Sequence, residues 1–324
     1  MNTVLRKLRP INTFCEGDKV QGFYLCVEKH LKYKRNREVY IDLELRDITG
    51  FITAKIWDNV SILNKKFDSG NAVAVSGVVE IFLDQPQLII KKINKATVQH
   101  YGRYGFDPSL VVPSSKKNQK KMWNDLERII NKIKNTYIKR LIKSIYKANV
   151  KRLAILPGSV KLQYNYRSGL LEHTLSMSRV AKKICPLYKV DSDLVLAGIL
   201  LHGVGKIDEI NSEYESDFTV DGHLLGTGPL SRDIVKKAIS KIKNFPISLS
   251  KMIEHMILNC DFDHKLESKM RPSFPEALLV KQIILLDSKM NLMDSVLSED
   301  QEVSRFTSRH NFFGVPILKK NDSK

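Results

Sequence analysis

Closely spaced cysteines and long apolar runs are both missing from this sequence. The four cysteines include no Cys-x-x-Cys pair, so neither a zinc ribbon nor a disulfide framework is indicated. No apolar stretch approaches the roughly 20 residues that a membrane-spanning helix needs. The basic residues of the N-terminus are not followed by the apolar core of a signal peptide. We therefore expect a protein of the reducing cytoplasm that has no membrane partner.

Acidic residues are also few in comparison with basic ones. The sequence has 35 aspartates and glutamates against 53 lysines and arginines, which gives a formal net charge of +18. A charge of this size favours a polyanionic partner, either nucleic acid or an anionic surface, although a lysine-rich proteome would produce the same excess. The hydrophobic share of 43% is that of an ordinary globular protein, and 324 residues suffice for two domains with their own cores.

The first part of the chain alternates with a period of two residues. Apolar residues alternate with polar or aromatic ones over residues 40–46 and again over 51–57. Such alternation is typical of strands with one buried face. Five short strands in residues 1–98 predict a small closed β-barrel of the OB type. The later predicted strands are Ala72–Ile81 and Gln87–Ile93, with a turn at Asp84–Pro86 between them.

One face of this predicted barrel carries aromatic rings interleaved with cations. This combination suits single-stranded nucleic acid, because bases stack on the rings while phosphates pair with lysine and arginine. The alternative is that the rings pack beneath a neighbouring helix and the charges are merely solvated. The predicted nucleic-acid-binding residues are Tyr40, Arg46, Phe51, Lys55 and Trp57 on the strands, and Lys34, Arg35 and Arg37 in the first loop.

The remainder of the chain changes from a strand pattern to a helical one. Residues 99–117 are rich in glycine, proline and serine and predict a linker. Residues 118–297 repeat apolar positions every three or four residues and predict an all-α domain, and residues 298–324 form a basic tail. The first helical stretch, Met122–Ile145, is either one helix or two broken near Asn135. The other predicted helices are Leu170–Leu187, Asp193–Val204, Ile234–Ile242, Leu249–Leu258 and Pro275–Leu297.

Several short motifs follow one another in the order found in a known family. They are Tyr40–Asp47 (YIDLELRD), Arg167–Thr174 (RSGLLEHT), His255–Leu258 (HMIL) and Arg271–Pro272. With these motifs, and with a barrel, a linker and a helical domain in the same order, the sequence resembles the YhaM-type 3′–5′ exoribonucleases. The resemblance implies an OB-fold followed by an all-α HD domain, which hydrolyses single-stranded RNA, and sometimes DNA, stepwise from the 3′ end with a metal.

The resemblance also implies the position of a metal site. His173, His202 and Asp287 stand where the HD domain has ligands, and Lys206 matches a lysine that faces phosphate, which makes it the candidate catalytic residue. Gly203 stands where the family has the aspartate of its His-Asp pair, and glycine offers no side-chain ligand. Further positions where the family has histidines are also changed in this sequence: Thr227, Lys281, the pair Cys260-Asp261 and the pair Gln163-Tyr164.

These losses predict a hydrolytic site that is largely or wholly inactive and takes no cofactor. The protein would then bind single-stranded RNA or DNA without cleaving it, and Lys206 and Lys281 would hold phosphate as point charges. A second interpretation is an active nuclease with manganese or zinc at an altered site. A third is a scaffold that forms a homo-oligomer or pairs with an active nuclease relative. The ligands of the altered site would be His173, His202 and Asp287 with Cys260 or Asp261.

Overall fold

The computed structural model describes residues 9–34, 36–211, 214, 216–260 and 271–319. The chain divides into two compact units. One comprises residues 1–114 with 212–216, and the other comprises residues 115–211 with 217–324. Within the described ranges, no helix is both long and apolar enough to cross a membrane. Arg35 and Asp261, both named above as candidate site residues, lie outside the described residues.

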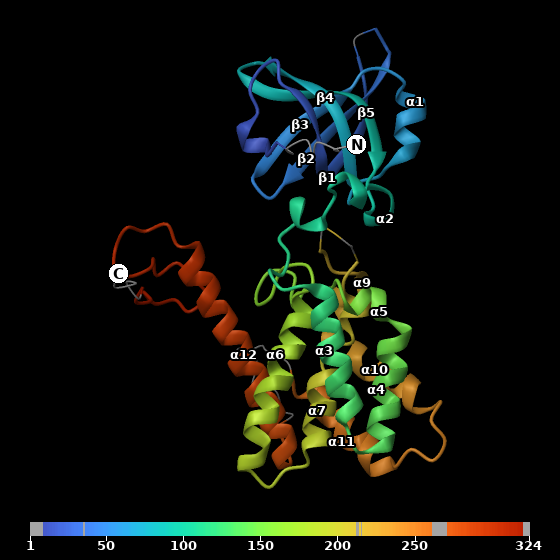
Figure 1. The fold of residues 1–324 in the computed structure, drawn as a ribbon, viewed down its shortest axis with the longest axis vertical. Helices are drawn as coiled ribbons and strands as arrows, with labels where there is room; N and C mark the ends of the chain where they lie inside the picture. Colours follow the sequence, from blue (N-terminus) through green and yellow to red (C-terminus); the bar gives the residue numbers. More distant parts are fainter. Residues whose placement is uncertain (1–8, 35, 212–213, 215, 261–270, 320–324) are drawn as a thin grey trace. The chain divides into compact units, whose positions relative to one another are not determined.

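The first unit is a closed β-barrel with the strand order β1-β2-β3-β5-β4 (Figure 1). Neighbouring strands are antiparallel except β3 and β5, which run parallel and close the barrel through Thr53↔Gln87, Ala54↔Leu88 and Lys55↔Ile89. The short helix α1 (Val60–Leu63) follows β3. This barrel confirms the OB-fold predicted from the alternating sequence. The strands are β1 (Lys19–Tyr33), β2 (Val39–Asp47), β3 (Gly50–Ile56), β4 (Ala72–Phe82) and β5 (Gln85–Lys95).

The barrel core follows directly from the alternation. Along β2 the side chains of Ile41, Leu43 and Leu45 are buried, whereas the intervening side chains lie on the outer face. The turn between β2 and β3 is fixed by Asp47, whose Oδ1 accepts hydrogen bonds from the backbone N–H groups of Thr49 (2.7 Å) and Gly50 (3.1 Å). Aspartate favours turns because it can accept such local bonds. The hairpin therefore presents the other face of both strands to solvent.

The turn between β4 and β5 differs from the prediction. It consists of Leu83 and Asp84, because Phe82 pairs with Gln85 and the predicted turn residue Pro86 already lies within β5. Leu83 and Asp84 have φ angles of 50° and 59°. Both angles are positive, as the most common two-residue hairpin turn requires, and asparagine and glycine adopt them far more readily than leucine.

Replacing Leu83 with asparagine is therefore expected to stabilise the barrel by about 1 kcal/mol, since the left-handed conformation costs an ordinary residue roughly that much. The side chain is largely exposed, so little packing is lost. Urea unfolding, followed through Trp57 fluorescence in a Trp123→Phe background, measures the change. The control is Leu31→Asn, at an exposed position in extended β1, which should give no gain. A lower free energy of unfolding in Leu83→Asn would contradict the claim that the positive φ of Leu83 strains the turn.

The second unit is helical and carries its own apolar core (Figure 1). The predicted stretch Met122–Ile145 forms two helices, which are separated by a cap. The Asn135 side chain accepts hydrogen bonds from the N–H groups of Tyr137 and Ile138, a strong helix-starting arrangement. The longer helices are α3 (Gln119–Lys132), α4 (Thr136–Ala148), α6 (Gly169–Ile184), α7 (Ser192–Leu201), α10 (Thr227–Ile239), α11 (Ile247–Leu258) and α12 (Pro275–Glu299).

Several features differ from the predictions, among them helix α10, which begins at Thr227, seven residues before the predicted start at Ile234. Helix α7 ends at Leu201, so His202 and Gly203 follow the helix and do not lie inside it. The stretch predicted as an irregular linker contains short helical turns over Val98–Tyr101 and Pro108–Leu110. After α12 the chain is held in a local loop, where Phe306 and Leu318 form an isolated antiparallel bridge. Each difference depends on contacts that a local pattern does not contain.

Candidate functional site

Aromatic rings and cations meet at one end of the outer barrel face. The rings of Tyr40 and Trp57 lie 4.7 Å apart between centroids. The ammonium of Lys55 lies 5.6 Å from the Tyr40 ring centroid, 5.4 Å from that of Trp57 and 5.3 Å from that of Phe82. Lys34, from the first loop, lies 5.1 Å from the Trp57 centroid. We call Lys34, Tyr40, Lys55, Trp57 and Phe82 the aromatic cluster.

The aromatic cluster contains one residue that the sequence reasoning missed. Phe82 ends β4 beside the β4–β5 turn and is 57% exposed. A large aromatic residue next to a predicted turn was the signal in the sequence that could have identified Phe82 as part of the binding face. Lys34 lies in the β1–β2 loop and Phe82 borders the β4–β5 turn, and these are the two connections that flank the binding face of an OB-fold. Ammonium groups over ring faces are attracted by the ring electrons, which helps to hold Lys55 above the face.

The other predicted residues of this face do not join the aromatic cluster. Arg46 lies 5.7 Å from the ring of Phe51. This pair is six residues along β2 from Tyr40, a distance of about 20 Å in a strand. Asp42 and Glu44 lie on the same face between the two ends, and Asp42 forms an ion pair with Lys32. The face therefore has two aromatic and basic ends with acidic residues between them. Arg37 is exposed in the first loop.

In the helical unit, Asp287 of α12 is buried and binds three side chains. Its Oδ2 accepts hydrogen bonds from the hydroxyl of Tyr164 (2.8 Å) and from Nδ1 of His173 on α6 (2.7 Å). Its Oδ1 accepts one from the hydroxyl of Ser176. Burial favours the protonated acid, but the bonds from His173, Ser176 and Tyr164 outweigh it and hold the pKa of Asp287 below its usual value. Asp287 is thus an ionised carboxylate inside a closed network.

His202 lies beside this network without joining it. The ring centroids of His173 and His202 are 5.7 Å apart, and the rings are nearly perpendicular. The Nδ1 atom of His202 donates to the backbone carbonyl of Ile199 at 2.7 Å. Burial and the adjacent His173 depress the pKa of His202 to about 3, so its imidazole is neutral near neutral pH. Of the three predicted ligands, His173 and Asp287 therefore contact each other, and His202 lies close to His173.

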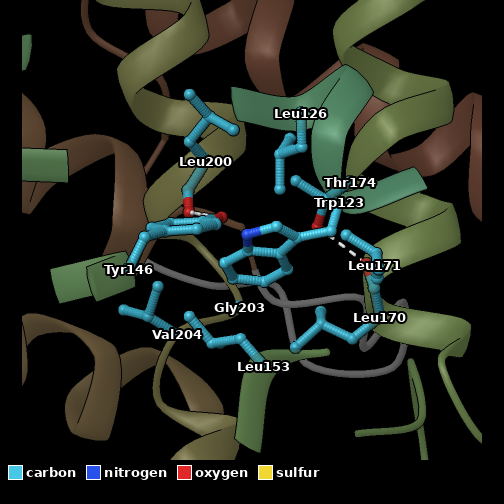
Figure 2. A pocket seen from close by; sticks show the side chains of 10 residues that line it. All are labelled: Trp123, Leu126, Tyr146, Leu153, Leu170, Leu171, Thr174, Leu200, Gly203 and Val204. Carbon is cyan, nitrogen blue, oxygen red and sulfur yellow. Dashed lines mark hydrogen bonds between the residues drawn. The ribbon is translucent and has the colours of Figure 1, made fainter. Parts of the chain in front are cut away.

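Gly203 faces an apolar cavity of about 10 Å³ (Figure 2). The side chains of Trp123, Tyr146 and Leu170 surround it in this view, and the Tyr146 hydroxyl is already bonded to the carbonyl of Leu200 at 2.8 Å. A Cβ atom at Gly203 would lie 2.9 Å from Cδ1 of Leu170. A side chain at this position would therefore start against the Leu170 side chain.

Lys206 and Lys281 differ in their surroundings. The ammonium of Lys206 lies 3.2 Å from Oε2 of buried Glu209 and 3.3 Å from the hydroxyl of Thr227. Thr227 donates to the same carboxylate at 2.6 Å. Lys281 is partly buried on α12, and it is not among the hydrogen-bond partners that Asp287 has within the described residues. The charge of Lys206 is therefore neutralised within the fold, which the sequence reasoning did not anticipate because it missed Glu209.

Among the described residues, which do not include the candidate ligand Asp261, the donor set does not fit a hydrolytic metal centre. No group of three or more His, Cys, Asp or Glu side chains in the described part of the chain is placed to hold a metal ion. Both oxygens of Asp287 are engaged by protein hydrogen bonds, and Gly203 supplies no ligand. The Cys260 thiol donates to the carbonyl of Met256 at 2.9 Å. We therefore derive no chemical step through a metal in this unit.

Known proteins match both units. Residues 25–96 match the OB-fold nucleic acid binding domain family, and residues 170–298 match the HD domain family. The 3′-5′ exoribonuclease YhaM of Listeria monocytogenes is 27% identical over 87% of this chain and 88% of its own length. That of Bacillus subtilis is 28% identical over 90% of this chain and 92% of its own.

Among solved structures, the second OB-fold domain of replication protein A from Methanococcus maripaludis matches with 16% identity and a TM-score of 0.23. That match covers 27% of this chain and 92% of the other. The two exoribonuclease relatives, in contrast, align with both units in the same order. The chain is thus a homologue of the YhaM-type 3′–5′ exoribonucleases, built from an OB-fold domain followed by an HD domain.

Proposed function

We propose that this protein binds single-stranded RNA through the outer face of its barrel and does not hydrolyse it. The observation that carries the proposal is the aromatic cluster, in which three rings lie within 6 Å of one ammonium group, that of Lys55. Rings of this kind stack on bases, while an adjacent cation attracts the phosphates. The formal net charge of +18 adds a long-range attraction for a polyanion.

The RNA part of the proposal is supported by the relatives, whose names describe exoribonucleases. The single-stranded part is supported by the rings, because bases within a duplex are already stacked and cannot reach them. The Phe51 and Arg46 pair at the far end of the face extends the contact surface. A strand that spans both ends must pass Glu44 and Asp42, of which Asp42 is paired with Lys32.

The absence of hydrolysis is proposed from the helical unit. Cleaving a phosphodiester near neutral pH requires an activated water, which metal-dependent nucleases obtain from a bound cation. Here Gly203 supplies no carboxylate, and Asp287 is committed to Tyr164, His173 and Ser176. The neutralised Lys206 does not offer a free charge for phosphate in this arrangement.

The test is an end-labelled single-stranded RNA incubated with the protein and manganese, with binding measured by fluorescence anisotropy on the same sample. We expect binding without shortening of the RNA, and the same result with zinc. The Bacillus subtilis relative, assayed in parallel, shows that the RNA and the metal support cleavage. Stepwise shortening from the 3′ end that disappears in His202→Ala would contradict the proposal. If the protein neither binds nor shortens the RNA, the result would favour a scaffold that partners an active nuclease or a second copy.

A further inference from the structure

A groove of about 590 Å³ lies beside the aromatic cluster. Lys34 and Val39 line it from the first loop and the start of β2, and Trp57, Asp58 and Asn64 line it from the segment that follows β3. Trp57 therefore belongs both to the aromatic cluster and to the wall of the groove. The volume exceeds what one nucleobase needs, and the groove continues from the ring surface on which a base would stack.

The polar side chains of this groove have unused hydrogen-bonding capacity. Oδ1 of Asn64 is buried and has no hydrogen-bond partner among the described residues. Asp58 is exposed and, within the same residues, forms no hydrogen bond or ion pair through its carboxylate. Asn59 precedes helix α1 with a φ of 54°, and its side chain does not cap that helix. Buried acceptors in folded proteins are normally satisfied, so a group that donates hydrogen bonds completes this site.

Asp58 offers only acceptors, which restricts the base that it suits. An ionised aspartate only accepts, and it binds best to two adjacent donors. Guanine presents two adjacent donors, the ring N1–H and the exocyclic amino group. Adenine and cytosine each place one amino group beside a ring nitrogen acceptor, and uracil places its single N–H between two carbonyl oxygens. A carboxylate would face an acceptor in each of those three cases.

We propose that this groove binds a guanine base of single-stranded RNA, with Asp58 as the residue that determines specificity. The base stacks on the Trp57 indole and donates N1–H and one amino hydrogen to the Asp58 carboxylate, while Asn64 Oδ1 accepts from the second amino hydrogen. Lys34, which in the free protein lies over the Trp57 ring and pairs with exposed Glu38 of the same groove at 2.9 Å, exchanges that carboxylate for the adjacent phosphate. This inference rests on the proposed function, because a strand must first be held on the barrel face.

The experiment compares short oligouridines that differ at one internal position, which carries uridine, guanosine, adenosine or cytidine. Anisotropy gives each dissociation constant at one fixed salt concentration, because salt alters phosphate contacts. We expect the guanosine strand to bind on the order of tenfold more tightly than all-uridine RNA. In Asp58→Asn this preference should disappear while the affinity for all-uridine RNA stays within about twofold. Asn64→Leu should reduce the preference as well.

The matched control is Asp84→Asn, which removes the same charge from the exposed β4–β5 turn. It should keep the preference for guanosine. Equal affinity of the wild-type protein for all four strands would overturn the guanine site and leave the proposed function standing. A preference for adenosine or cytidine would overturn the assignment of the base. Failure to bind any strand would overturn the proposed function itself, and a preference that persists in Asp58→Asn would remove Asp58 from the site.

Discussion

Replacing Asp287 with alanine should lower the free energy of unfolding of the helical unit by about 3 to 5 kcal/mol. The substitution leaves His173 and the hydroxyls of Tyr164 and Ser176 without the acceptor that they share. Unsatisfied buried donors each carry a desolvation cost. Urea unfolding, followed through Trp123 fluorescence in a Trp57→Phe background, measures the loss. Asp287→Asn keeps the shape of the side chain and should lose less.

The sign of this effect separates two roles for Asp287. A carboxylate that serves only as a metal ligand contributes little to the free energy of unfolding when no metal is bound. Its removal would then leave the metal-free protein equally stable or more stable. A carboxylate that serves as a structural acceptor gives the loss predicted above. Asp294→Ala, at an exposed position on the same helix α12, is the control and should change stability by less than about 0.5 kcal/mol. Unchanged stability in Asp287→Ala would contradict the structural role.

Replacing Trp57 with alanine should weaken binding of single-stranded oligouridine by about five- to 150-fold. Stacking of one base on an aromatic ring contributes about 1 to 3 kcal/mol. The substitution also removes a ring that lies 4.7 Å from Tyr40 and 5.4 Å from the ammonium of Lys55. We expect the slope of affinity against salt to change little, because phosphate contacts determine that slope. Anisotropy titrations at several salt concentrations measure both quantities.

A matched control for this variant is Tyr104→Ala. Tyr104 is also an exposed aromatic residue of the first unit and also lies close to a cation, Arg103, but it follows the barrel strands in a short helical turn. Its replacement should leave oligouridine binding unchanged. Equal losses in Trp57→Ala and Tyr104→Ala would show that general exposure of rings, and not the aromatic cluster, determines affinity.

The barrel and the helices could be predicted because their patterns are local. Alternation over residues 40–46 and 51–57 fixed which side chains enter the barrel core. Spacings of three and four residues identified the helices, whereas one helix or two broken near Asn135 both fitted the pattern, and the structure has two, α3 and α4. Tyr40, Lys55 and Trp57 were found because they alternate with core residues on neighbouring strands, so the register of β2 and β3 brings them together.

The missed residues depend on contacts between distant parts of the chain. Tyr164 reaches Asp287 across 123 positions of sequence. Phe82 meets Lys55 only because β5 closes the barrel between the strands that carry them. Glu209 neutralises Lys206 one turn away, yet its burial depends on the packing of the unit around it. Sequence patterns identify residue types and faces, whereas partners of this kind follow from the assembled fold.

The parallel pairing between β3 and β5, which we call the seam, is the shortest strand pairing in the barrel. The three residue pairs of this seam are far fewer than those that join β4 to β5. Lys55 is part of the seam, and the aromatic cluster straddles it, since Tyr40 lies on one side and Phe82 on the other. Single-stranded RNA stacked across these aromatic side chains would therefore stabilise the pairing of β3 with β5. The closed barrel would in turn bind RNA more tightly than an open one, because binding and closure are linked.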